Sequence, residues 1–76
     1  MVERGDWPDR ASRFLKTELK RQGVTYDQLA VLLAKEGLEE TKSSIANKVS
    51  RGTFTGGFLM AALKVIGVQM IRVEDF

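Results

Sequence analysis

Small polar and basic side chains recur in residues 41–54, TKSSIANKVSRGTF, a stretch without an acidic residue. A helix over residues 41–51 would bury Ile45, Ala46 and Val49 along one side. Its opposite side would carry Ser43, Ser44, Asn47, Lys48 and Arg51. Asn can pair with adenine, Lys and Arg can pair with guanine, and Ser can contact bases or phosphates. The pattern favours DNA as a partner, although a solvated polar helix would have the same composition.

Enzyme chemistry has few suitable side chains in this sequence. The chain contains neither cysteine nor histidine, which removes thiolate nucleophiles, imidazole bases and almost every zinc or copper site. Aspartate and glutamate could hold Mg²⁺, but no acidic cluster has a useful spacing outside a charged loop. The serines lack a histidine partner. We therefore expect no enzyme activity, no cofactor and no metal.

The chain has the size and composition of one small folded domain, with 76 residues, of which 43% are hydrophobic and 29% charged. We treat residues 1–76 as one domain, with a frayed segment at 1–7 and a tail at 69–76. The N-terminus lacks an apolar signal core, and the longest apolar stretch, FLMAALKVIGVQMI, contains Lys64 and is too short to cross a bilayer. These features predict a cytoplasmic protein without a membrane partner.

Charge is distributed unevenly along the chain, although the net charge is only +2. Residues 41–73 contain basic residues but no acid, and acidic pairs at 39–40 and 74–75 flank them. A second basic cluster comprises Arg10, Arg13, Lys16, Lys20 and Arg21. This asymmetry favours an anionic partner, nucleic acid first. Solvated helix faces would give the same pattern, so charge alone leaves both interpretations open.

Four helical patterns would position these groups. Each opens on a proline or threonine suited to a helix start and closes on a glycine suited to a left-handed stop. The expected helices run from Pro8 to Gly23, from Thr25 to Gly37, from Thr41 to Gly52 and from Thr55 to Gly67. Gln28, three residues after Thr25, completes the pattern of a capping box.

Three further features carry local expectations. Trp7 is expected to cover the core, and the alternative is an exposed aromatic that stacks on a base. Gly56 and Gly57 weaken the first turn of the fourth helix, which suggests that another helix, or alternatively a phosphate, approaches its backbone closely. The tail, VQMIRVEDF, alternates loosely and is β-prone, so it predicts one short strand. A single strand is not stable alone, so it must pack on the body or pair with a second copy.

The order of these patterns resembles the helix-turn-helix domains of the Cro and phage-repressor type, the XRE-like regulators. The matching stretches are QLAVLL, SSIANKVSRG and FLMAALKVIGV, and the resemblance covers roughly Leu15 to Val68. Ala30 after Leu29 matches the small residue of the scaffold helix, and Ile45 matches the buried residue of the recognition helix. The resemblance implies an all-α, four-helix fold. It also implies a small bacterial or phage transcriptional regulator with residues 41–51 in the major groove.

Residue roles follow from the resemblance by position relative to Ile45. The implied base contacts are Lys42, Ser43 and Asn47. The implied phosphate contacts are Thr25, Tyr26, Ser44, Lys48, Arg51 and Thr53. Tyr26 could instead be an aromatic residue at the edge of the core. The family usually acts as a dimer on two half-sites, so we expect a homodimer with the tail or fourth helix at the interface.

One departure and two alternatives accompany this interpretation. From Ala30 to Ile45 is 15 residues (45 minus 30), several more than the family's spacing, so the scaffold helix or the turn is lengthened. The insertion brings Glu39 and Glu40 beside the expected DNA surface, where we expect them to cap and form the turn. A protein-interaction module, such as an antitoxin or accessory subunit, is the main alternative. RNA binding would need exposed stacking aromatics.

Overall fold

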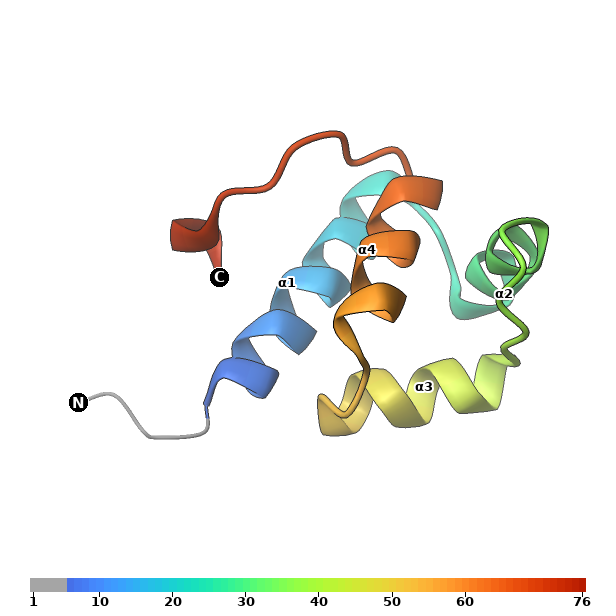
Figure 1. Ribbon diagram of the computed structural model, residues 1–76, viewed down its shortest axis with the longest axis horizontal. Coiled ribbons are helices and arrows are strands. Elements are labelled where there is room, and N and C mark those ends of the chain that lie inside the picture. Colours follow the sequence, from blue (N-terminus) through green and yellow to red (C-terminus); the bar gives the residue numbers. More distant parts are fainter. Residues whose placement is uncertain (1–5) are drawn as a thin grey trace.

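The computed structural model describes residues 6–76, and within them the chain is all-helical with no strand (Figure 1). The elements are α1 (Trp7–Gln22), α2 (Tyr26–Lys35), α3 (Lys42–Arg51), α4 (Gly56–Val65) and a short 3-10 helix (Val73–Asp75). The all-α, four-helix expectation is therefore confirmed. Residues 1–5 of the expected frayed segment lie outside the described residues, and α1 already begins at Trp7.

Threonine side chains cap the starts of three helices. Thr25, Thr41 and Thr55 each accept a hydrogen bond from the backbone N–H three residues further on, and such a cap contributes about 1 kcal/mol. The expected capping box at Thr25 is confirmed, and α3 has a second one between Thr41 and Ser44. Local sequence therefore sets where α2, α3 and α4 begin.

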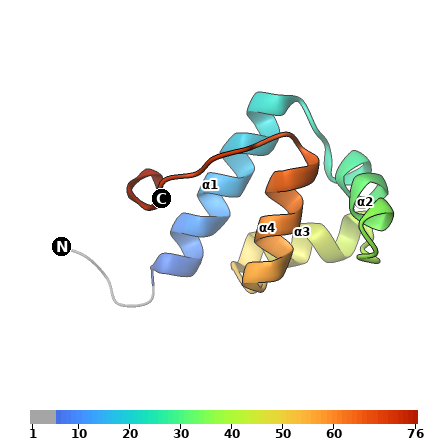
Figure 2. The ribbon, with the colours of Figure 1, turned by 45° about the horizontal axis from the view of Figure 1, so that its top comes forward.

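The core lies where the inner faces of the four helices meet. Helix α1 packs against α3 and α4, and α2 packs against the same two helices (Figures 1 and 2). Five large side chains are completely buried: Leu15, Leu29, Leu33, Ile45 and Val49. Because the last two are the expected apolar stripe of α3, the opposite side of α3 is turned away from the core.

The end of α3 is held against the start of α1 by two contacts. The buried Ser12 hydroxyl donates a hydrogen bond to the Val49 carbonyl oxygen. Gly52 ends α3 with φ 65°, and a Cβ there would lie 2.8 Å from the Pro8 carbonyl oxygen. These contacts fix the orientation of α3 relative to α1.

The structure does not confirm a strand in the tail, which the sequence pattern suggests. Residues 69–76 run back across α1 and end in the 3-10 helix (Figure 2). The Phe76 ring stacks on Phe14 with centroids 4.5 Å apart. An alternating pattern has no ladder partner here, because the rest of the domain is helical. The tail instead packs on the body of the domain through this aromatic contact. Packing on the body was one of the two arrangements expected for it, the other being pairing with a second copy.

Two other local expectations are corrected. Trp7 is 51% exposed rather than covering the core, and the Arg10 guanidinium lies 4.3 Å from its ring centroid. No other helix closely approaches Gly56 and Gly57, since a Cβ at Gly56 would meet nothing within 4 Å and one at Gly57 would meet only the Thr55 hydroxyl at 3.8 Å. The glycines therefore mark open space at the start of α4.

Candidate nucleic-acid interface

The outward side of α3 presents polar side chains that have no partner in the described part of the domain. Ser43, Asn47 and Arg51 follow one another at intervals of four residues and are exposed, so they lie in one row along the helix. Within residues 6–76, the side-chain hydrogen bonds and ion pairs of α3 are made by Lys42, Ser44 and Lys48 and not by these three residues. The three groups can therefore bind a partner without breaking an internal contact.

Lys42 lies at the N-terminal tip of the same helix. Its ammonium is 3.9 Å from the Asp27 carboxylate in the first turn of α2, and both side chains are mostly exposed. An exposed ion pair of this kind is weak and is screened by salt. The structure thus brings the three expected base contacts, Lys42, Ser43 and Asn47, onto one exposed part of α3.

Glu40, immediately before the N-cap of α3, is turned inward onto that helix. One carboxylate oxygen accepts a 2.6 Å hydrogen bond from the Ser44 hydroxyl, and the other lies 2.5 Å from the Lys48 ammonium. The Glu40 side chain is only 8% exposed. We name Glu40, Ser44 and Lys48 the Glu40 clamp. Two of the expected phosphate contacts, Ser44 and Lys48, are therefore already bound to an internal partner, the Glu40 carboxylate.

The Glu40 clamp also decides the charge beside the outward side of α3. Burial raises the pKa of the Glu40 carboxyl, but hydrogen bonds from Lys48 and Ser44 and the Lys48 charge outweigh it. The pKa of Glu40 therefore lies below its usual value of 4.5. The carboxylate stays ionised at neutral pH, and its charge is matched by Lys48. The Lys48 ammonium is also 5.3 Å from the centroid of the Phe58 ring of α4.

The remaining expected phosphate contacts differ in accessibility. Arg51 and Thr53, at the C-terminal end of α3, are exposed. The Thr25 hydroxyl accepts from the Gln28 backbone N–H, and the Thr25 N–H donates to the Gln28 side chain. Tyr26 is half-buried and packs against the core, as the alternative interpretation of this residue expected.

The lengthened region is a turn. Helix α2 ends at Lys35 and α3 begins at Lys42, so residues 36–41 connect them. Glu36 in this turn forms a 3.0 Å ion pair with Lys64 of α4. Glu40, through its contacts with Ser44 and Lys48, holds the turn to the start of α3, which is the structural role expected for it. Glu39 is exposed. Sequence reasoning missed the clamp, although Ser44 at the third helical position was a usable signal for a capping box.

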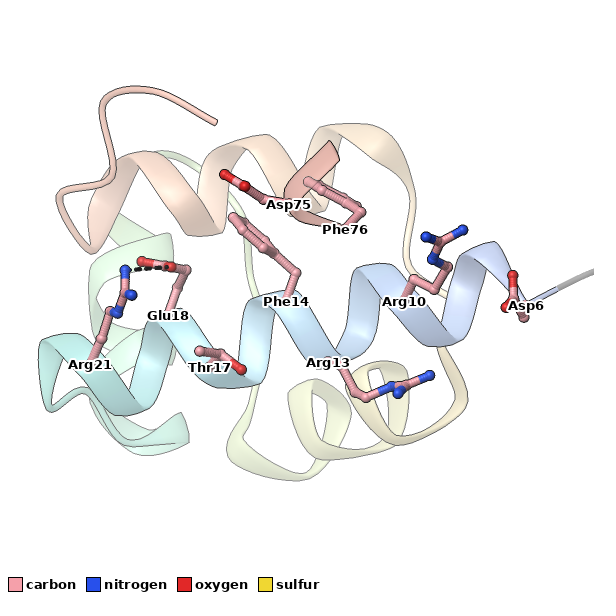
Figure 3. Close-up of a pocket in the computed structure, with 9 residues that line it drawn as sticks. All are labelled: Asp6, Arg10, Arg13, Phe14, Thr17, Glu18, Arg21, Asp75 and Phe76. Carbon is pink, nitrogen blue, oxygen red and sulfur yellow. Dashed lines mark hydrogen bonds and ion pairs between the residues drawn. The ribbon is translucent and has the colours of Figure 1, made fainter. Parts of the chain in front are cut away.

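A separate hollow of about 740 Å³ lies between α1 and the tail (Figure 3). Its lining residues are Asp6, Arg10, Arg13, Phe14, Thr17, Glu18, Arg21, Asp75 and Phe76. Three basic side chains face three acidic ones, so the hollow has no excess charge that would select a ligand. The stacking of Phe76 on Phe14 closes one side of it, and the sequence alone did not predict this arrangement.

In the described part of the chain, no group of three or more Asp, Glu, His or Cys residues could hold a metal ion. None of the helices formed by residues 6–76 is long and apolar enough to cross a membrane.

Comparison with known proteins gives one family match. A family model described as a domain of unknown function, DUF6471, matches residues 7–71, which include all four α-helices. No curated protein and no solved structure matches the chain significantly. The matched range covers the whole candidate interface.

Proposed function

The chain belongs to the DUF6471 family, and from the geometry of α3 we propose that it binds double-stranded DNA sequence-specifically, with α3 in the major groove. One observation carries the proposal. The outward row of Ser43, Asn47 and Arg51 is exposed, and Glu40, the acid next to α3, is matched by Lys48. A helix with short polar side chains and no exposed acid can approach bases without repulsion from phosphate.

The proposal assigns two kinds of contact on α3. Lys42, Ser43 and Asn47 contact base edges, and a well-formed bidentate pair such as Asn with adenine contributes about 1–3 kcal/mol of discrimination. Arg51 and Thr53 contact phosphates beside the groove. Among the other expected phosphate contacts, Thr25 and Tyr26 would approach the backbone at the start of α2. Ser44 and Lys48 would first have to exchange Glu40 for phosphate.

A small DNA-binding domain without enzyme activity or cofactor fits a transcriptional regulator in the cytoplasm of a bacterium or in phage infection. This assignment follows the resemblance to Cro-type and phage-repressor domains. The order α2, turn and α3 would act as the helix-turn-helix, with α2 as the scaffold helix and α3 as the recognition helix.

We further propose that the regulator is a homodimer, because one domain of this size makes only a small interface with DNA. Met60 of α4 is 64% exposed and Met70 of the tail is 82% exposed. Both line a mostly apolar hollow of about 490 Å³ between α4 and the tail. A second copy seated there would bury these side chains and provide the dimer that two half-sites require. Sedimentation showing a monomer at high concentration, with and without DNA, would contradict this arrangement.

The exposed apolar side chains also favour a second candidate function, a protein-interaction module on the same fold. Val31 and Val73 are more than half exposed, like the two methionines. In an antitoxin or accessory subunit, these residues would contact a different protein. A stable complex that covers α3, together with no measurable affinity for DNA, would favour this candidate.

The experiment that tests the proposal is fluorescence anisotropy of a labelled random duplex, titrated with protein at several salt concentrations. If phosphates are neutralised, the logarithm of the association constant falls linearly with the logarithm of salt concentration, with a slope of about −0.9 for each phosphate contacted. Arg51→Gln should reduce the slope by about one contact. An absence of binding at low salt would refute the proposal.

A further inference from the structure

A second exposed basic surface lies on α1, outside the interface described above. Lys16 and Lys20 are exposed and four residues apart, so their ammonium groups project from the same side of the helix. Within residues 6–76 neither lysine forms an ion pair, whereas Arg13 pairs with Asp9 and Arg21 pairs with Glu18. Like charges at this spacing destabilise a helix slightly. Lys20 lies in the last turn of α1, where the helix dipole favours a cation, whereas Lys16 lies before that turn.

The position of these lysines is set by the junction of α1 with α3. Ser12 contacts α3 through the Val49 carbonyl oxygen. Lys16 and Lys20 follow Ser12 by four and eight residues, so they continue the same row along α1, turning gradually outward. The row therefore turns away from α3 as α1 runs toward its C-terminal end (Figure 1). In Figure 3, the Arg13 side chain lies on the side of α1 away from Asp75 and Phe76.

The lysine row is continuous with the exposed end of α3 through the start of α2. Lys16 and Lys20 line a shallow hollow of about 270 Å³ together with Thr25 and Tyr26. Asp27, in the same first turn of α2, is close to Lys42 of α3. Asp27 is an acidic residue between the lysines of α1 and Lys42 in the order of the chain, and its carboxylate is within ion-pairing distance of the Lys42 ammonium. The lysines of α1 thus lie beside the start of α2, and the first turn of α2 lies beside Lys42 at the tip of α3.

From this arrangement we propose that Lys16 and Lys20 contact the sugar-phosphate backbone of the same DNA whose major groove α3 enters. The inference rests on the proposed function and adds a surface that the helix-turn-helix pattern did not supply. Ammonium groups on flexible stems bind phosphate as point charges without selecting a base. The lysine row therefore increases affinity for every sequence equally and leaves base selection to α3.

The test compares two double variants that each remove two positive charges. Lys16→Gln with Lys20→Gln removes the lysine row. Lys35→Gln with Arg72→Gln is the matched control, since Lys35 lies in the last turn of α2, at the opposite end of that helix from Tyr26, and Arg72 lies in the tail. All four side chains are exposed, and circular dichroism would verify that both variants are folded.

Random-duplex affinity is measured for each protein across a range of salt concentrations. Loss of two phosphate contacts lowers the magnitude of the salt slope by about 1.8, so between roughly 50 and 200 mM salt the lysine-row variant loses about tenfold less affinity than the wild type. The control should keep the wild-type slope. Equal slopes for the two double variants, with the wild type binding DNA, would overturn the lysine row and leave the proposed function standing. A wild type that binds no DNA at low salt would overturn both.

Discussion

The Glu40 carboxylate and the Lys48 ammonium lie 2.5 Å apart across the first two turns of α3. Through this contact the acid directly before the N-cap of α3 is turned inward and matched by a lysine. The Ser44 hydroxyl, which also belongs to the N-terminal capping box, donates to the same carboxylate. The Glu40 clamp therefore links the start of α3 to the electrostatics of the proposed DNA surface.

The first prediction concerns release of Lys48. Glu40→Gln removes the charge that holds the lysine, so Lys48 becomes available to phosphate. We expect higher affinity for random duplex DNA and a salt slope larger by about 0.9, the effect of one added contact. Anisotropy titrations at several salt concentrations provide the measurement.

Glu39→Gln is the matched control for this prediction. Glu39 is the neighbouring acid, is exposed and has no place in the Glu40 clamp, so its removal changes the net charge equally without releasing a lysine. The two variants should therefore differ in slope. If both change DNA binding by the same amount, general electrostatics accounts for the effect and Lys48 does not contact DNA.

The second prediction concerns stability and pH. The pKa of Glu40 in the folded state lies below 4.5, because the hydrogen bonds and charge of its partners outweigh the effect of burial. The unfolded state therefore takes up the proton first on acidification. The stabilisation by Glu40 is present above pH 4.5 and is lost as pH falls through the folded-state pKa.

Urea unfolding of the wild type and Glu40→Gln measures this dependence. At neutral pH the wild type should be more stable by about 1 kcal/mol, a value discounted for the partial exposure of Lys48. The difference should shrink steadily below pH 4.5. A difference that stays constant down to acid pH would show that the Glu40 charge does not stabilise the fold.

The third prediction concerns the junction of α1 and α3. Gly52→Ala places a methyl group 2.8 Å from the Pro8 carbonyl oxygen and strains a residue at φ 65°. Gly23→Ala has nearly the same strain at φ 69°, but nothing lies within 4 Å of its added methyl group. Left-handed strain alone costs about 1–2 kcal/mol.

We therefore expect Gly52→Ala to lower the free energy of unfolding clearly more than Gly23→Ala, as measured by urea denaturation. The added cost arises because both atoms in the clash belong to the backbone or to a Cβ, which cannot rotate away. Equal losses of stability in the two variants would mean that the α1–α3 junction tolerates an added methyl group.

The fourth prediction separates base contacts from phosphate contacts. Asn47→Ala should cost about 1–3 kcal/mol on the preferred sequence and relax selection at one base pair, while Arg51→Gln should weaken binding to all sequences similarly. Selection from a randomised duplex pool, carried out with each variant, provides the measurement. If Asn47→Ala enriches the same sequences as the wild type, Asn47 makes no contact with a base edge.

Much of the fold follows from local sequence signals. The threonine caps at 25, 41 and 55 and the glycines at 23 and 52 act within one turn of the chain, so their effects are visible without tertiary information. The apolar stripe of Ile45 and Val49 likewise predicts which side of α3 is buried. Exposure of Ser43, Asn47 and Arg51 follows from the same periodicity.

Features that depend on tertiary packing could not be predicted in the same way. The tail alternates like a strand, but its conformation depends on the stacking of Phe76 on Phe14, 62 residues earlier in the chain (76 minus 14). The Glu40 clamp requires a turn that points a carboxylate back over α3, and the spacing of Glu40 and Lys48 alone does not show this. The resemblance to Cro-type domains stays a prediction, because the matched family model assigns no function.

The most direct test of the central claim is an amide chemical-shift titration of the isotopically labelled protein with duplex DNA at low salt. The proposal predicts that the largest shift changes fall on residues 42–53, with a second group near Lys16 and Lys20, and that added salt reverses them. Changes concentrated on α4 and the tail around Met60 and Met70 would contradict α3 as the DNA-contacting helix. An absence of changes at any residue would contradict DNA binding itself.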